Sequence, residues 1–114
     1  HHMDTFEAFL EKVRGQIPSS YTWERDDRMN AWLVVINESD SEQIKERIAG
    51  LFGSTWDSSS LGKASKPEKT AAKSLGGIQK GQLLFTALEG DSVFFGAWWP
   101  WGDGTKVSLR VGRL

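Results

Sequence analysis

Residues 93–111 have the pattern of two β-strands joined by a glycine-containing turn. The sequence of this stretch is Val93-Phe94-Phe95-Gly96-Ala97-Trp98-Trp99-Pro100-Trp101-Gly102-Asp103-Gly104-Thr105-Lys106-Val107-Ser108-Leu109-Arg110-Val111. In its second half, Val107, Leu109 and Val111 alternate with polar side chains. Such alternation is typical of a strand with one buried and one exposed face. The stretch therefore predicts a C-terminal hairpin with two chemically different faces.

The turn determines the register of this hairpin. With Asp103-Gly104 as its two central residues, opposite positions on the two strands can be paired directly. The predicted pairs are Trp98 with Leu109, Trp99 with Ser108, Pro100 with Val107, Trp101 with Lys106 and Ala97 with Arg110.

This register divides the aromatic residues between the two faces. Phe94 and Trp98 share a face with the apolar residues of the last strand, so we assign them to the core. The opposite face defines a candidate binding surface, since aromatic rings beside cations suit protein partners, carbohydrates or nucleobases. Its residues are Phe95, Trp99, Trp101, Lys106 and Arg110. Two alternatives would make these rings ordinary core: a one-residue slip in register, or a helix covering the second face.

Outward from the hairpin, the remaining elements follow from hydrophobic periodicity and capping signals. Ala31–Ile36 is a continuous apolar run, which predicts a strand covered on both faces. The other expected elements are a helix over 5–15 capped by Asp4, a strand over 21–25, a helix from the capping box at Ser39–Glu42 to Gly53, and strands over 82–88, 93–101 and 106–111.

These elements predict a single α+β domain over residues 1–114. Its order is helix, strand, strand, helix, loop and three strands. We expect the two helices to pack on one face of an antiparallel sheet of about five strands. Residues 1–2 have the character of a tag remnant and enter no argument about chemistry.

Residues 54–80 differ in character from the rest of the chain. The segment is polar and rich in small residues, which predicts a loop or insertion, with a short helix over 67–75 opened by Ser65–Glu68. We expect residues 54–66 to be mobile, with limited proteolysis cutting first near Lys63 or Lys66, because their apolar area does not offset the ordering cost.

The same segment carries five lysines, at positions 63, 66, 69, 73 and 80, against Asp57 and Glu68. Mobile ammonium groups attract phosphates without sequence preference, so this basic segment is a secondary candidate surface. The alternative is a solvated loop whose charge maintains solubility.

Composition excludes several classes of function. Apart from His1 and His2 the chain has no histidine, and it has no cysteine, so thiolate nucleophiles, Cys/His zinc sites and histidine bases are excluded. The net charge of −1 provides no overall attraction to nucleic acid or anionic membranes. We expect no metal, no cofactor and no membrane association, and a cytoplasmic protein.

Candidate catalytic groups are few. Ser60 with Lys63, and Thr70 with Lys73, have the spacing of a hydroxyl–lysine dyad. A lysine in an exposed loop stays protonated and cannot act as a base, so we interpret both spacings as chance.

Together these features predict a non-catalytic domain that binds another macromolecule. We expect a protein partner and a small regulatory, inhibitor or immunity-type protein, with the aromatic face of the C-terminal sheet as the binding surface. Single-stranded nucleic-acid binding by the same tryptophans with the lysines and arginine is the alternative. A small-ligand carrier or hydrolase is a second alternative, and self-association into a homodimer is also open.

Overall fold

Six antiparallel strands form one open sheet in the computed structural model, which describes residues 5–28, 30–90 and 92–113. The expected tag remnant at residues 1–2 and the expected cap at Asp4 lie outside the described residues. The elements are α1 (Thr5–Gly15), β1 (Trp23–Asp26), β2 (Ala31–Asn37), α2 (Glu38–Ala49), β3 (Ser54–Trp56), the 3₁₀ helix η1 (Leu61–Lys63), α3 (Lys66–Ser74), β4 (Leu83–Glu89), β5 (Ser92–Pro100) and β6 (Lys106–Arg113).

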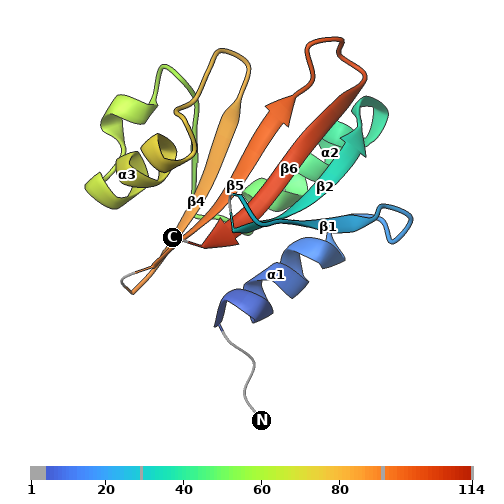
Figure 1. The fold of residues 1–114 in the computed structure, drawn as a ribbon, viewed down its shortest axis with the longest axis horizontal. Coiled ribbons are helices and arrows are strands. Elements are labelled where there is room, and N and C mark those ends of the chain that lie inside the picture. The colour runs from blue at the N-terminus through green and yellow to red at the C-terminus, as the bar shows by residue number, and fades with distance from the viewer. Residues whose placement is uncertain (1–4, 29, 91, 114) are drawn as a thin grey trace.

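The strand order is β1-β2-β6-β5-β4-β3, as Figure 1 shows. The last strand, β6, lies between β5 and β2 and so joins the C-terminal strands to the N-terminal hairpin. The fold class is α+β with an antiparallel sheet, as expected, but the sheet has six strands rather than about five. The additional strand is β3, three residues that pair with β4 at the edge.

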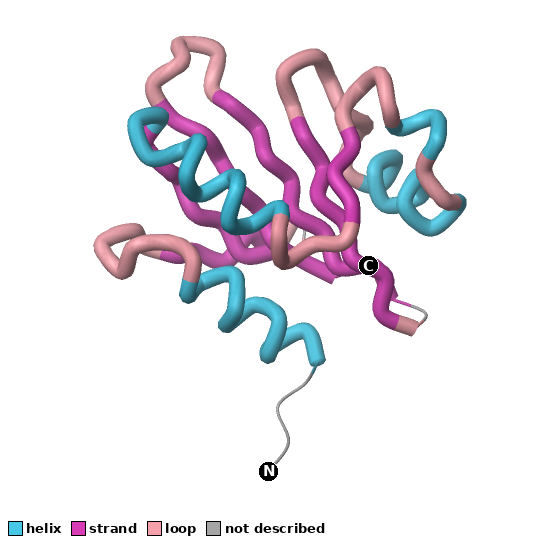
Figure 2. Tube along the Cα trace, turned by 180° about the vertical axis from the view of Figure 1, so that it is seen from behind, coloured by secondary structure: helices cyan, strands magenta, loops and turns pink. Residues whose placement is uncertain are grey.

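The helices lie on both faces of the sheet. Seen from behind in Figure 2, α1 and α2 cross the near face, whereas Figure 1 shows α3 on the opposite side beside β4. The prediction of two helices on one face is correct for α1 and α2. The short helix expected over 67–75 is α3, and its position on the opposite face of the sheet was not predicted.

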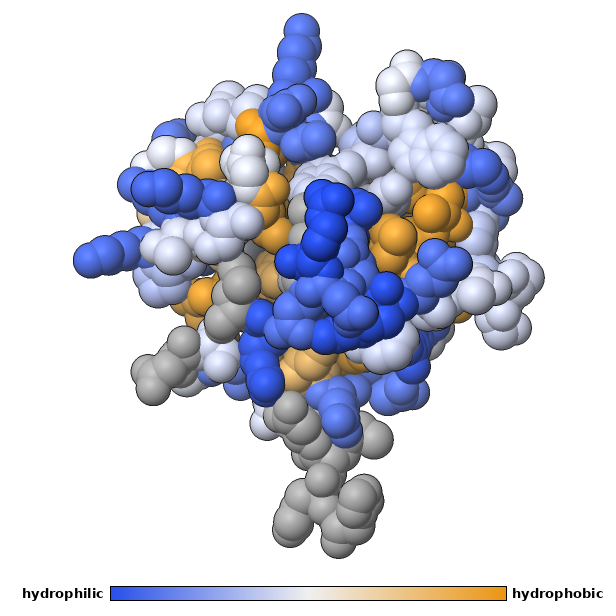
Figure 3. Space-filling model, viewed as in Figure 1, coloured by the Kyte–Doolittle hydropathy of each residue, from blue (hydrophilic) through white to orange (hydrophobic). Residues whose placement is uncertain are grey.

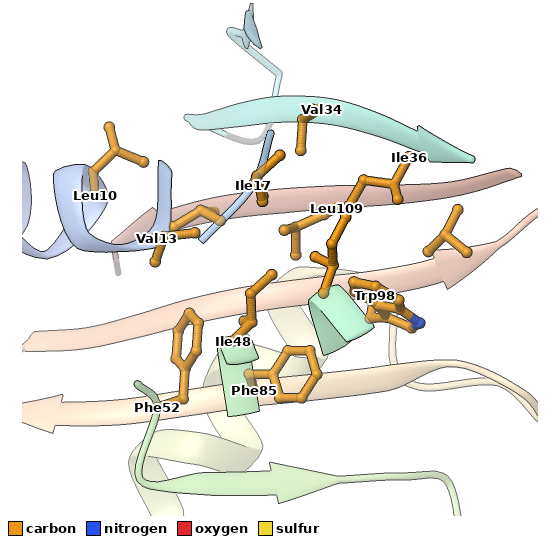
Figure 4. Close-up of a cluster of buried hydrophobic side chains, with 13 residues drawn as sticks. Leu10, Val13, Ile17, Val34, Ile36, Ile48, Phe52, Phe85, Trp98 and Leu109 are labelled. Atoms are coloured by element: carbon orange, nitrogen blue, oxygen red, sulfur yellow. The ribbon is translucent and has the colours of Figure 1, made fainter. Parts of the chain in front are cut away.

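The main core lies between the sheet and the two helices α1 and α2. Figure 4 shows Leu10 and Val13 of α1 and Ile48 of α2 directed toward the same buried region as Val34 and Leu109 of the sheet. Phe94 and Trp98, which the hairpin register assigned to the core, are both buried. This packing buries the face of the central strands that is turned toward α1 and α2, which we call the near face. These two helices do not cover the opposite face, which we call the far face.

Two local expectations about α2 are wrong. The helix begins at Glu38 with Asn37 as its N-cap, not at a capping box formed by Ser39. It ends at Ala49 with Gly50 as the C-cap, before the expected stop at Gly53. A tertiary hydrogen bond stabilises the first residue of α2, because the Glu38 amide donates to the carbonyl of Thr105 in the β5–β6 turn at 3.0 Å.

Residues 54–80 contain β3, η1 and α3, so the segment forms regular structure where a loop or insertion was expected. The short helix lies one residue from its predicted bounds, with the capping box of Ser65 and Glu68 at its start. After it, Gly76 and Gly77 adopt left-handed φ angles of 90° and 87°. The mobility of residues 54–66 in solution stays a prediction.

Candidate binding surface

The register of the sheet places the predicted surface residues in rows across the far face. Residues that pair between neighbouring strands share a face, so the pairs β1–β2, β2–β6 and β6–β5 extend into rows. The rows are Glu24–Leu33–Arg110–Ala97, Val35–Ser108–Trp99 and Asn37–Lys106–Trp101. The predicted pairing of Trp99 with Ser108 and of Ala97 with Arg110 is confirmed.

One half of this face is covered by α3. We call it the covered half-face, and it consists of Trp56 of β3, Leu84 and Thr86 of β4, and Phe95 of β5. Phe95 is fully buried in a cluster with Leu84 and with Ala72 of α3. The expectation that Phe95 belongs to an exposed surface is therefore corrected, because a helix covers that part of the second face.

The buried cluster under α3 extends from Phe95 across β6 to Ala31 of β2. A Cβ atom added to Gly112 of β6 would lie 2.6 Å from Cζ of Phe95, so the ring rests directly on the backbone of β6. Glycine is required there because no larger residue leaves room for the ring.

The other half of the far face carries none of the three helices described by the structure. We call it the open half-face, and its residues are Glu24 and Asp26 of β1, Leu33 and Val35 of β2, Lys106, Ser108 and Arg110 of β6, and Trp99 and Trp101 at the end of β5. Leu33 and Val35 are only partly buried. The expectation that β2 is covered on both faces holds at Ala31, which is buried in the cluster under α3, but not at Leu33 and Val35.

Arg110 lies at the centre of the open half-face and contacts Trp99 on one side and Asp26 on the other. Its guanidinium lies over the ring of Trp99, 4.9 Å from the centroid. Its Nε also donates to Asp26 Oδ2 at 2.8 Å, and both side chains are about four-fifths buried, with exposed fractions of 20% and 18%. A planar cation held between a ring and a carboxylate is pre-organised, so little side-chain entropy remains to be lost on binding.

Trp101 and Lys106 occupy the end of the open half-face near the hairpin turn. The indole N–H of Trp101 donates to Ser108 Oγ at 2.9 Å, which fixes the ring while 41% of the residue stays exposed. Lys106 Nζ donates to Asn37 Oδ1 at 3.0 Å. Apart from Phe95, the predicted site residues therefore lie together on one surface.

Figure 3 shows this side of the molecule. Apolar surface is visible on both sides of a central hydrophilic band. On the open half-face, the exposed apolar groups come from Leu33, Val35 and Trp101, and the neighbouring charges come from Arg110 and Lys106. Tryptophan and arginine are enriched in protein interfaces, whereas lysine is depleted there.

The five lysines of the secondary candidate surface are all exposed. Lys66, Lys69 and Lys73 follow the outer side of α3, Lys63 lies in η1, and Lys80 follows the helix. Among the described residues, none of the five forms an ion pair. The three lysines of α3 lie on the same side of the sheet as the open half-face, whereas Lys80 lines a pocket with residues of α2.

Glu68, the one carboxylate between Asp57 and Glu89, is directed inward from α3. Its Oε2 accepts a hydrogen bond from the Trp56 indole at 3.0 Å and another from the Thr86 hydroxyl. Its Oε1 accepts from the Ser65 hydroxyl at 2.7 Å. Burial acts to raise the pKa of Glu68, but these hydrogen bonds outweigh burial and hold the pKa below its ordinary value. The buried charge is satisfied internally and fastens α3 to the sheet.

The hydroxyl groups of the two candidate hydroxyl–lysine dyads form local hydrogen bonds with the backbone. Ser60 Oγ accepts from the amide of Asp57 at 2.9 Å, and Thr70 Oγ1 donates to the carbonyl of Lys66 at 2.9 Å. The partner lysines 63 and 73 are exposed. The geometry gives neither hydroxyl a desolvated base.

An open groove of about 450 Å³ lies between α1 and the β1–β2 hairpin. Arg14 lines it, with its guanidinium 4.9 Å from the ring centroid of Trp32 and 3.3 Å from Glu11. The groove is also lined by Glu7, Arg25, Asn30 and Arg113, and the buried Nε of Arg14 has no hydrogen-bond partner among the described residues. In the part of the chain that the structure describes, no three His, Cys, Asp or Glu side chains are grouped to hold a metal ion.

Sequence reasoning missed Leu33, Val35, Glu24 and Asp26 as members of the surface. The apolar run over residues 31–36 could have indicated Leu33 and Val35, because an all-apolar strand must be covered on both faces or expose apolar area. The two acidic residues carried no such signal, because only the β2–β6 pairing places β1 beside the C-terminal hairpin.

No protein-family model matches the chain, and no curated protein or solved structure is similar enough to count as a match. None of the helices in the described ranges has the length and apolar character needed to cross a membrane.

Proposed function

We propose that this protein is a non-catalytic binding domain that recognises a protein partner through the open half-face, as a small regulatory, inhibitor or immunity-type protein. The observation that carries the proposal is the apolar side of β2: Leu33 and Val35 are partly exposed with no described helix over them, and β6 separates them from Trp99. Exposed apolar groups bordered by fixed charges are a common feature of interaction sites.

The chemistry of the surface favours a protein partner over other ligands. Trp101 provides a large exposed ring whose orientation is fixed by Ser108, and Arg110 is pre-positioned by Asp26. Tryptophan and arginine are the residues that most often dominate the binding energy of protein interfaces.

The double variant Trp99→Ser/Trp101→Ser tests the proposal. We expect it to keep a cooperative unfolding transition and to lose partners that the wild-type protein captures from an extract of its own cells. Leu88→Ser is the matched control, because Leu88 is 53% exposed but lies at the distant β4–β5 hairpin. Unfolding of the double variant, or equal capture by all three proteins, would contradict the proposal.

Single-stranded nucleic acid is the second candidate, supported by the exposed lysines of α3, none of which forms an ion pair among the described residues, and by the exposed ring of Trp101. Titration with an oligothymidylate at low salt should then quench tryptophan fluorescence, and added salt should reverse the quenching. The triple variant Lys66→Gln/Lys69→Gln/Lys73→Gln should abolish this signal. Absence of quenching by wild-type protein at low salt would remove this candidate.

A further inference from the structure

We propose that the groove between α1 and the β1–β2 hairpin binds a small monocarboxylate with an apolar body. Two of its lining residues, Leu10 and Trp32, belong to the main core or pack against it, so the groove lies on the near face of the sheet. The open half-face lies on the far face, and the proposal is therefore independent of the proposed function. Four features support it: the charges of the groove, the way its arginines are held, an unpaired buried donor and its apolar walls.

The charged residues of the groove leave a small excess of positive charge. Arg14 of α1, Arg25 of β1 and Arg113 of β6 line the groove, together with Glu7 and Glu11 of α1. Three arginines against two glutamates give the lining a net charge of +1, in a chain whose net charge is −1. A ligand with a single negative charge balances this lining, whereas the glutamates would repel the second charge of a phosphate dianion.

Aromatic rings hold two of these arginines in place. Cζ of Arg14 lies 4.9 Å and Cζ of Arg25 lies 5.5 Å from the ring centroid of Trp32. Cζ of Arg14 also lies 5.6 Å from the ring centroid of Trp23. Contact with a ring uses the flat face of a guanidinium, while its N–H groups point outward in the plane, where a carboxylate can accept two of them. The rings therefore pre-position the cations for an anion.

The hydrogen-bonding capacity of Arg14 is not fully used within the described part of the chain. Only 32% of its side chain is exposed, yet its buried Nε has no hydrogen-bond partner among the described residues. The acidic partners of Arg14 and Arg25, which are Glu11 and Asp27, are exposed, and exposed ion pairs are weak. Because almost every buried donor in a protein is paired, an unpaired one points to a partner from outside the chain. A carboxylate beside Arg14 supplies this guanidinium with acceptors.

The apolar walls and the size of the groove define the rest of the ligand. Phe6, Leu10 and Trp32 form the apolar part of the lining, and the contacts of Leu10 and Trp32 with the main core fix these walls. The volume of about 450 Å³ is within the range of small-molecule sites, and such sites combine apolar walls with a few polar groups. An aromatic or branched aliphatic body with one carboxylate matches the walls, the volume and the charge.

Nitrogen–proton correlation NMR spectra of the intact protein test the site. The probes are 3-phenylpropionate and 4-methylpentanoate, each compared with its neutral primary amide, and phenyl phosphate at about pH 8, where its phosphate is a dianion. We expect each carboxylate to shift the indole N–H resonance of Trp32 with a dissociation constant below about 1 mM, and its amide to bind at least about tenfold more weakly. The proposal is overturned by equal binding of acid and amide, by tighter binding of phenyl phosphate, or by no shift up to about 10 mM carboxylate.

Charge-neutralising variants test the arginines. Arg14→Gln and Arg25→Gln should each weaken carboxylate binding by about tenfold and leave amide binding unchanged, because only the charged group loses a partner. Arg25→Gln is the more informative of the two, since Arg25 is exposed whereas Arg14 packs on two rings. Arg47→Gln is the matched control, because Arg47 is an exposed arginine of α2 outside the groove. Wild-type affinity for the carboxylate in a folded Arg25→Gln variant would contradict the site.

A further comparison separates this site from the open half-face. The folded Trp99→Ser/Trp101→Ser variant should bind 3-phenylpropionate as the wild-type protein does, because neither tryptophan lines the groove. Loss of the shift at Trp32 in that variant would place the carboxylate elsewhere and overturn the proposal. Retained carboxylate binding in a variant that still captures every wild-type partner would leave this site intact while the proposed function fails.

Discussion

The covered half-face and the open half-face belong to the same sheet but are completed in different ways. On the covered side, α3 buries Phe95 and Leu84, and the Glu68 carboxylate satisfies the polar groups of Trp56 and Thr86. On the open side, Leu33 and Val35 remain partly exposed, and the polar groups pair within the surface. The difference shows that burial along one face of a sheet depends on which parts of that face the rest of the chain covers.

Truncating the covered half-face should have the largest effect. We expect Phe95→Ala to lower the free energy of unfolding by about 3–5 kcal/mol, because a fully buried ring is lost and a cavity remains between α3 and β6. Urea denaturation followed by circular dichroism would measure the loss. A cost below that of Trp101→Ala would mean that α3 does not pack tightly on Phe95.

Removing the charge of Glu68 should have the next largest effect. Glu68→Gln should cost about 1.5–3 kcal/mol at neutral pH, because charge-assisted hydrogen bonds are lost from a buried site. Trp56 contacts Glu68 directly, so its fluorescence should report the loosening of α3.

The same variant predicts a pH dependence. The folded-state pKa of Glu68 is lowered, so its stabilising contribution is present above the unfolded pKa of about 4.3 and is lost as the pH falls through the folded value. Wild-type protein should therefore lose more stability between pH 7 and pH 3 than Glu68→Gln does. Equal losses in the two proteins would contradict this role for Glu68.

Gly112→Ala tests the border between the two half-faces. The new methyl group would press on the ring of Phe95, which is buried and cannot move freely, so we expect a loss of about 1–3 kcal/mol. Gly102→Ala is the matched control, since no atom lies within 4 Å of its added Cβ. Similar melting temperatures for the two variants would mean that the ring yields without cost.

Changes on the open half-face should have the smallest effect on stability. We expect Trp101→Ser to change the unfolding free energy by less than about 1 kcal/mol, because 41% of the residue is exposed. Urea denaturation would measure the change. Losses as large as that of Phe95→Ala would show that the open half-face is part of the core.

Much of the local structure could be predicted from short-range patterns. The register of the C-terminal hairpin followed from the turn at Asp103-Gly104 and from the alternation along β6, and it is confirmed. The capping box of Ser65 and Glu68 likewise predicted α3. Both are signals contained within a few residues, where backbone propensity and side-chain hydrogen bonds decide the conformation.

The candidate site was predicted only in part, because exposure depends on what packs over a residue. Trp99, Trp101, Lys106 and Arg110 were placed on the correct face, but Phe95 on the same face is buried by α3. The alternation of a strand identifies its two faces and does not tell which parts of a face a distant helix covers.

The sequence by itself determined the α+β class, the hairpin register, the positions of most elements and the separation of the aromatic residues between two faces. These properties depend on periodicity, caps and turns, which act over a few residues. Only the tertiary structure decided that β6 lies between β5 and β2, that α3 covers half of the far face, and that Asp26 meets Arg110. The physical reason is that each of these arrangements joins segments far apart in the chain, where the free energy of packing, rather than local preference, selects the partner.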